Sequence, residues 1–226
     1  MKRFTAVVSV AGMLALWPLE ASAQEKGPVE KGTFVLGAER LTGIFHSDVK
    51  VDPDYSDGTT TIALFGMGTT GLLGGGVGIG TMQLPRIGFD GFVIDGLSIG
   101  GSFVVFNAAD DNGSETDFLL APRVGYAYMF SSVIGIWPRG GLSYWHASYS
   151  PNRGRDFADG SAHAFAFDVD CPLLIFPAKA FAITVGPLLD VSFGGKWSRQ
   201  TGNGTEISND LSVTQFGLSA GIAGFF

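Results

Sequence analysis

The last sixteen residues of the chain, 211–226, alternate between two kinds of side chain. One face of this segment is oily and consists of Thr214, Phe216, Leu218, Ala220, Ile222, Gly224 and Phe226. The other face is mainly small or polar and consists of Val213, Gln215, Gly217, Ser219, Gly221, Ala223 and Phe225. A period of two indicates a β-strand. We predict that this strand closes a transmembrane β-barrel and turns its oily face to lipid.

Composition agrees with a membrane protein built from strands. Only 15% of the 226 residues are charged, whereas soluble chains have about 25% charged residues. Gly accounts for 34 residues, which is about twice the share of about 7% that is usual in soluble chains. The longest apolar stretch after the N-terminal segment, Pro172–Leu189, is interrupted by Pro177, Lys179 and Pro187. A spanning helix needs roughly 20 uninterrupted apolar residues. The chain is therefore oily without a candidate membrane helix, as a set of membrane strands is.

The N-terminal segment is typical of a secretory signal peptide. A basic start, Met1–Arg3, precedes an apolar stretch, Phe4–Trp17, and the small residues Ala21–Ala23 form a cleavage site. The apolar stretch is shorter than the roughly 20 residues of a membrane-spanning helix. The expected organisation is a signal peptide over 1–23, a linker over 24–31 and a barrel domain over 32–226.

Charge and cysteine content exclude several kinds of site. The formal net charge of −7 argues against a nucleic-acid partner, because phosphate binding needs basic patches. Cys171 is the single cysteine and has no disulfide partner in the chain. His46 and His163 are isolated, and no spacing of His, Cys or carboxylates predicts a metal site. We expect neither a metal nor a cofactor.

Period-two alternation recurs along the chain and predicts about eight strands. They cover Gly32–Phe45, Gln83–Val93, Leu97–Val105, Phe118–Phe130, Ile136–Trp145, Ala164–Ile175, Phe181–Phe193 and Leu211–Phe226. The Gly-rich run 71–76 lacks the Lys of a phosphate-binding loop, so we treat 47–80 as a loop. If 59–80 adds two strands, the barrel has ten.

The connections alternate between short and long. Asp95–Gly96, Ser131–Ser132 and Pro177–Lys179 form tight turns. The segments between them are long and polar: 47–80, 108–116, 150–160 and 194–210. In an antiparallel up-and-down barrel every second connection lies on the same rim, so this alternation predicts one rim of turns and one of loops.

Charged residues in the middle of the strands show which face points inward. Arg86, Arg123 and Arg139 each follow a Pro in a short repeated motif and lie on the face opposite the oily one. An Arg facing lipid at the midplane costs roughly 2–4 kcal/mol. We therefore predict an inward charge network with five carboxylates, Glu39, Asp90, Asp168, Asp170 and Asp190.

Two interpretations of this network are open. An eight-stranded barrel leaves room only for side chains, so the charges would pair and fill the lumen. Alternatively, they line a narrow conduit for ions. Small residues on the inward face favour tight filling: Gly88, Gly100, Gly125, Gly141, Gly186, Gly217 and Gly221.

Aromatic residues of the oily face gather near the strand ends, as in the two interfacial girdles of a membrane barrel. Those toward the long loops are Phe118, Tyr144, Phe165 and Phe193. Those toward the turns are Tyr128, Phe130, Phe181 and Phe226.

One motif is similar to a known catalytic element. His146-Ala147-Ser148 is similar to the His-x-Ser element of the outer-membrane lipid A 3-O-deacylases, in which His activates a Ser. The family has Asn where this chain has Tyr149, and no Glu follows at a matching distance; Asp156 and Asp159 are the nearby substitutes. We therefore predict that the protein is not an enzyme.

The strand pattern, loop asymmetry, signal peptide and terminal Phe226 together resemble the small outer-membrane β-barrel proteins, of the type of the transmembrane domain of outer membrane protein A or outer membrane protein X. The resemblance implies a monomer in the outer membrane of a Gram-negative cell, with membrane lipid and lipopolysaccharide around it. It also implies that the barrel-assembly machinery reads Phe226 as a signal. The expected role is structural or adhesive, through the loops; the alternative is a narrow porin or ion channel.

Overall fold

Twelve β-strand segments follow one another in the computed structural model, which describes residues 28–52, 55–64, 82–110, 113–151, 159–200 and 205–226. They are β1 (Phe34–Asp52), β2 (Tyr55–Leu64), β3 (Arg86–Ile94), β4 (Leu97–Asp110), β5 (Gly113–Tyr126), β6 (Tyr128–Met129), β7 (Ile134–Ile136), β8 (Arg139–Pro151), β9 (Gly160–Asp170), β10 (Leu173–Ala178), β11 (Phe181–Gln200) and β12 (Glu206–Phe225). The predicted signal peptide and the Gly-rich run 71–76 lie outside the described residues. Within them, no helix is long and apolar enough to cross a membrane.

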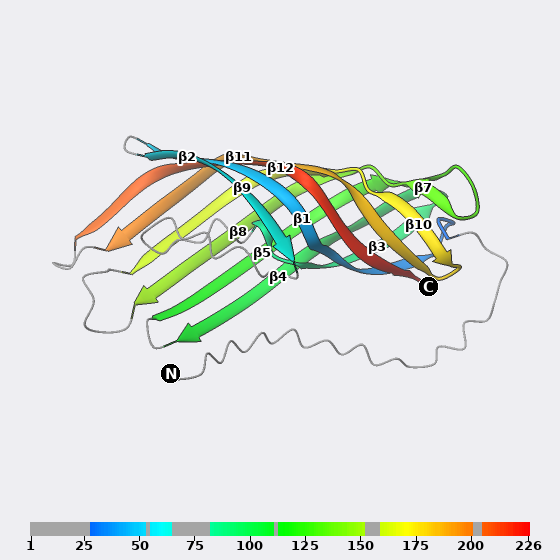
Figure 1. Ribbon diagram of the computed structural model, residues 1–226, viewed down its shortest axis with the longest axis horizontal. Coiled ribbons are helices and arrows are strands. Elements are labelled where there is room, and N and C mark those ends of the chain that lie inside the picture. Colours follow the sequence, from blue (N-terminus) through cyan, green and yellow to red (C-terminus); the bar gives the residue numbers. More distant parts are fainter. Residues whose placement is uncertain (1–27, 53–54, 65–81, 111–112, 152–158, 201–204) are drawn as a thin grey trace.

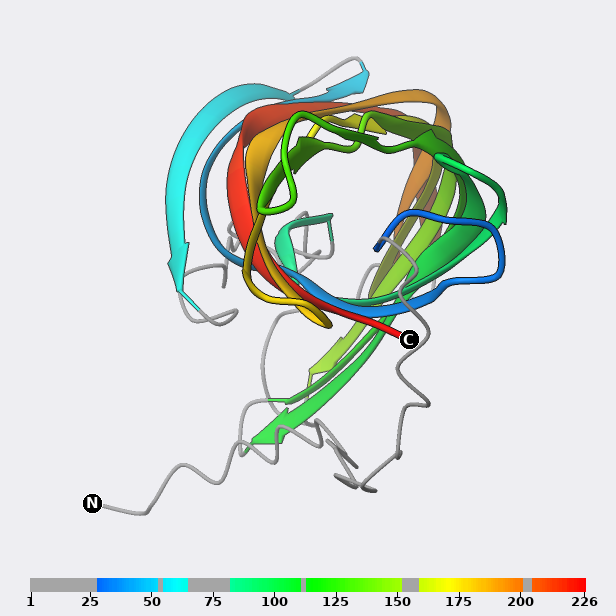
Figure 2. The ribbon, with the colours of Figure 1, turned by 90° about the vertical axis from the view of Figure 1, so that its right-hand side faces the viewer.

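These segments form a closed antiparallel barrel (Figures 1 and 2). Three barrel strands are each formed by two consecutive segments, namely β5 with β6, β7 with β8, and β9 with β10. The segment β2 pairs with β1 but lies outside the ring. The described chain thus has eight barrel strands, and β12 closes the ring by pairing with both β1 and β11. The predicted eight-stranded barrel is confirmed, and β2 does not enlarge the ring.

The first strand is longer than predicted and changes partner halfway along. Phe34–Glu39 pair with β3, whereas Thr42–Val51 pair with β2. The change occurs at Arg40, which has a φ of 53°, where the register with β12 also shifts. Such a bulge bends the strand and increases its twist. Beyond this point β2 takes the place of β3 beside β1, and Figure 2 shows β2 in cyan outside the ring.

The predicted loops 108–116 and 194–210 are largely extensions of paired strands, so those boundaries were wrong, whereas the loop predicted over 150–160 agrees with the end of β8 at Pro151 and the start of β9 at Gly160. The β4–β5 ladder continues to Asp110 and Gly113, the β8–β9 ladder to Tyr149 and Gly160, and the β11–β12 ladder to the pair Gln200 and Glu206. The prediction ended each strand where its outward face became polar. A backbone ladder does not require lipid, so these hairpins continue into water.

The opposite rim has the short turns that the sequence predicts. Asp95 and Gly96 connect β3 to β4, and Lys179 and Ala180 connect β10 to β11. Gly96 has a φ of +78°, a conformation that glycine adopts readily. The C-terminus lies at this rim (Figure 1), where the backbones of Phe34 and Phe226 exchange two hydrogen bonds of 2.9 and 2.8 Å.

Apolar side chains cover the outside of the wall instead of being buried. On β12, Phe216 is 50% and Leu218 57% exposed, while their neighbour Gln215 is fully buried in the lumen. The same alternation on the other strands produces a continuous apolar belt, which includes Phe89, Val124, Phe167, Val185 and Ile222. Monomeric soluble proteins rarely expose apolar patches of this kind. The belt therefore requires a lipid environment.

The position of the belt can be tested by placing an arginine at two heights on β12. Ile222→Arg lies within the belt and should reduce the free energy of folding into lipid vesicles by about 2–4 kcal/mol. Ser212→Arg points outward beyond the belt and should change it by about 0–1 kcal/mol. Urea titration of the vesicle-bound protein measures both values. Equal effects of the two substitutions would contradict the location of the belt.

Candidate functional site in the barrel lumen

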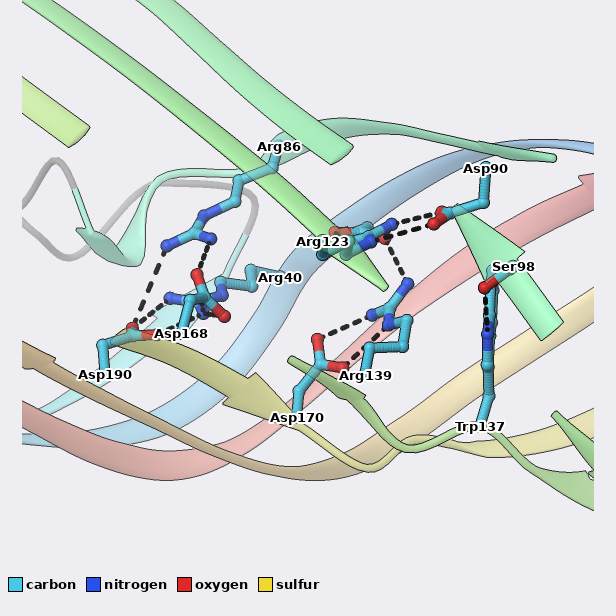
Figure 3. Close-up of polar contacts among 11 residues, drawn as sticks. Arg40, Arg86, Asp90, Ser98, Arg123, Trp137, Arg139, Asp168, Asp170 and Asp190 are labelled. Carbon is cyan, nitrogen blue, oxygen red and sulfur yellow. Dashed lines mark hydrogen bonds and ion pairs between the residues drawn. The ribbon is translucent and has the colours of Figure 1, made fainter. Parts of the chain in front are cut away.

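A layer of charged side chains crosses the middle of the lumen (Figure 3). Parity along the strands directs these residues inward, and the barrel brings together all eight that the sequence selected, with Arg40 as a ninth. This charged layer consists of Glu39, Arg40, Arg86, Asp90, Arg123, Arg139, Asp168, Asp170 and Asp190. Four guanidinium groups thus face five carboxylates.

Arg123 of β5 is the centre of one half of the layer. Its guanidinium donates to both oxygens of Glu39 at 2.7 and 2.6 Å and to both oxygens of Asp90 at 3.1 and 2.5 Å. Arg139 donates to Glu39 at 2.7 Å and to both oxygens of Asp170 at 2.7 Å. Such bidentate contacts fix the orientation of both partners.

The other half of the layer is built around Asp190 of β11. This carboxylate is fully buried and accepts hydrogen bonds from Arg40 at 2.7 and 3.0 Å and from Gln215 at 3.3 Å. Arg86 forms an ion pair of 2.5 Å with Asp168, which also lies 3.4 Å from Arg40. Two positive and two negative charges balance within this half.

Arg40 is the member that the sequence did not identify. In a regular strand, adjacent residues point to opposite faces, so counting by two cannot place both Glu39 and Arg40 in the lumen. The positive φ of Arg40 breaks this alternation and turns both side chains inward. The available signal was an arginine in the middle of a membrane strand, which is costly wherever it faces lipid.

Glycine makes room for the layer at one close approach. A Cβ built on Gly88 would lie 2.5 Å from Oε1 of Glu39 and 3.1 Å from a guanidinium nitrogen of Arg123. These distances are shorter than van der Waals contact, so any side chain at this position would displace the ion pair. Tight filling of the lumen, which the inward glycines predicted, is what the structure shows here.

An apolar layer fills the lumen on the side of the long hairpins. Trp145, Leu119 and Val213 point into it from the wall. Met82 and Leu84, which precede β3, enter it from inside the ring, and the teal segment in Figure 2 shows this course. The backbone oxygen of Met82 accepts a hydrogen bond of 2.6 Å from Arg40, so this inner segment rests on the charged layer. The sequence had placed Gln83 in a membrane strand, which was wrong.

An aromatic layer fills the lumen on the side of the short turns. Trp137 stacks on Phe92 at 5.8 Å between ring centroids, and Phe225 lies between Trp137 and Phe176 at 6.2 and 4.9 Å. The indole nitrogen of Trp137 donates to Ser98 at 3.0 Å, and the guanidinium of Arg139 lies 4.6 Å above its ring. The charged layer is therefore covered on both sides by close-packed apolar side chains.

Little space remains among these side chains. Two cavities border the charged layer and have volumes of about 10 and 20 Å³. A cavity needs roughly 10–15 Å³ to hold one water molecule. Each cavity thus has room for about one water. Among the described residues, no group of three or more His, Cys, Asp or Glu side chains is arranged to hold a metal ion.

The catalytic motif considered in the sequence lies outside the lumen. His146 faces outward on β8, and its ring stacks against that of His163 at 6.4 Å. The hydroxyl of Ser148 donates to the backbone oxygen of Thr116 at 3.4 Å, away from His146. Asp156 lies outside the described residues, and Asp159 is exposed. Among the described residues, His146 is thus not placed to act as a base that accepts the proton of the Ser148 hydroxyl.

The fold can be compared with that of known proteins. No protein-family model matches the chain, and no curated sequence is significantly similar to it. The solved structure of Neisserial surface protein A is similar, with 12% identical residues and a TM-score of 0.51, over 87% of this chain and 100% of that one. The outer membrane protein OprG from Pseudomonas aeruginosa also matches, with 11% identity, a TM-score of 0.47, and 89% and 99% coverage. This chain has the fold of the small outer-membrane β-barrels, and its exposed apolar belt is that of an outer-membrane protein.

Removing one arginine tests whether the charged layer stabilises the barrel. Arg123→Ala leaves Glu39 and Asp90 buried without their main partner, which should lower the free energy of unfolding by about 3–5 kcal/mol. Adding Glu39→Gln and Asp90→Asn should restore part of this loss. Thermal melting in detergent measures the effect, and Lys179→Ala in an exposed turn is the control. Unchanged melting of Arg123→Ala, with a new ion conductance, would contradict a filling role.

Proposed function

We propose that this protein is a non-enzymatic outer-membrane barrel that holds rigid β-hairpins above the membrane, in a structural or adhesive role. The observation that carries the proposal is the filling of the lumen: a charged layer lies between two apolar layers, with cavities of only about 10 and 20 Å³. A barrel filled in this way acts as a rigid support for the segments that project from it. The function then belongs to the parts that project from it.

The hairpin of β11 and β12 is the best-defined projecting part. Its strands pair from Lys196–Asp210 to Gln200–Glu206, beyond the apolar belt. Lys196 and Asp210 form an exposed ion pair of 2.5 Å, and the hydroxyls of Ser198 and Ser208 lie 3.2 Å apart. A paired ladder keeps such side chains at fixed positions, whereas a flexible loop would lose entropy on binding.

Further parts of the proposal concern the surroundings of the barrel. Lipopolysaccharide and membrane lipid would contact the apolar belt, and the protein would act as a monomer. Phe226 would serve as the signal for the barrel-assembly machinery, since its backbone pairs with Phe34 and fixes the end of β12 in the wall. The orientation expected for such barrels places the short turns in the periplasm and the long hairpins outside the cell.

A narrow porin or ion channel is the competing function, and conductance discriminates between the two. The protein reconstituted in a planar bilayer should produce no stable conductance steps, because the two cavities at the charged layer have volumes of only about 10 and 20 Å³ among the described side chains. Heat-dependent migration on SDS gels should show that the reconstituted protein is folded. Regular conductance steps from the folded protein would refute the support role and favour the channel.

Shortening a hairpin tests the adhesive role. Deleting 196–200 together with 206–210 removes the five outermost paired positions of β11 and β12 and leaves the belt intact. Cells that express this variant should adhere less to epithelial cells, or become more sensitive to detergent, while the barrel remains folded. A matched variant lacks 107–110 and 113–116 of the β4–β5 hairpin. If neither variant changes adhesion or detergent sensitivity, the hairpins do not carry the function.

A further inference from the structure

Two histidines from different strands lie side by side on the outer surface of the barrel. His146 of β8 and His163 of β9 are direct partners in the antiparallel ladder, so both side chains leave the wall at the same level. Their ring centroids are 6.4 Å apart and their planes are inclined by 29°. Residues directly opposite each other have Cβ atoms about 4.5–5.5 Å apart. Strand pairing therefore fixes the spacing of the two Cβ atoms that carry the imidazoles.

This spacing suits a shared metal ion. Imidazole nitrogens bind Zn²⁺ at about 2.0–2.1 Å, and adding roughly 1 Å from each nitrogen to its ring centre places two coordinated rings up to about 6 Å apart. Tetrahedral coordination places two such rings about 5 Å apart, so both side chains must rotate to close the observed 6.4 Å and turn one nitrogen of each ring toward the same ion. Neutral imidazole is a preferred ligand of copper and zinc.

The ring nitrogens are free to bind. Among the described residues neither imidazole has a hydrogen bond or an ion pair, and the ring contacts of the pair are with each other and with Tyr144. The third histidine, His46, differs in this respect. Its Nδ1 lies 2.9 Å from the hydroxyl of Thr60, and its Nε2 lies 3.4 Å from a carboxylate oxygen of Asp48.

The surroundings support the pair without blocking it. The next outward residues toward the belt are Tyr144 and Phe165, whose ring centroids lie 4.9 Å apart with their planes tilted by 47°, and they limit how far the histidines can bend that way. In the other direction, Ser148 is paired with Ser161, so the open side is polar. On β11, the ladder partner of His163 is Lys196. The positive charge of Lys196 is balanced by the carboxylate of Asp210, which lies 2.5 Å away.

We propose that His146 and His163 form a two-histidine site for a divalent transition-metal ion, such as Cu²⁺ or Zn²⁺, on the outer face of the barrel. Two imidazoles leave the remaining coordination positions to water or to an exogenous ligand. The site is independent of the lumen and of the proposed adhesive role. The sequence did not predict it because the two residues are far apart along the chain and meet only through the register of β8 and β9.

The test measures Cu²⁺ binding to the whole mature protein, folded in detergent and purified without a polyhistidine tag. Titration calorimetry should show one site, and electron paramagnetic resonance should show two equivalent nitrogen ligands. His146→Ala and His163→Ala should each weaken binding roughly 100-fold, because the second ligand of a fixed pair binds at high effective concentration. His46→Ala is the matched control and should bind Cu²⁺ like the wild type.

Several outcomes would overturn the proposal. They are the absence of Cu²⁺ binding by the wild type, wild-type affinity in both His146→Ala and His163→Ala, and loss of binding in His46→Ala. The last result would assign the ion to the cluster of His46 and Asp48 instead. Each variant must show the heat-dependent migration of a folded barrel, so that a change in binding is not attributed to misfolding. Both substituted histidines are on the outside, where folding should tolerate alanine.

Discussion

The pairing of arginine with carboxylate inside a narrow barrel is the interaction on which the rest of this structure depends. A guanidinium cannot face acyl chains without a large cost, and in the lumen of eight strands it finds no bulk water. It must therefore meet a carboxylate, as Arg123 meets Glu39 and Asp90. Because side chains alternate along a strand, fixing these charges inside also fixes their neighbours outside. The apolar belt and the charged layer are thus two consequences of a single register.

Much of this arrangement could be predicted from the sequence because it follows from a period of two. Counting by two placed Arg86, Arg139 and Asp190 in the lumen without knowledge of their partners. The same counting failed where the backbone departs from regular geometry, as at Arg40, whose positive φ turns two adjacent side chains inward. It also failed for Gln83, because the chain segment before β3 runs inside the ring and is held by hydrogen bonds that periodicity does not reveal.

The ends of the strands could not be predicted for a different reason. Hydrophobic alternation reports on lipid contact, and it stops at the membrane surface, whereas the hydrogen-bonded ladder of β11 and β12 continues into water as far as Gln200 and Glu206. On β1 the ladder even changes partner, from β3 within the closed barrel to β2 beyond it. Among the described residues, the wall is therefore a closed ring near the short turns. Toward the hairpins it is a curved sheet with β2 and β4 at its edges.

This continuation of the wall has a chemical consequence. In the lumen, the guanidinium and carboxylate groups of the charged layer pair with one another, so this layer stabilises the barrel. On the projecting strands, side chains keep the same fixed cross-strand spacing and have water on one side, and some of them are not engaged by a neighbour. His146 and His163 meet both conditions. A ligand site on such a barrel is thus expected where register is retained after lipid has ended, because only there are side chains both preorganised and free to bind.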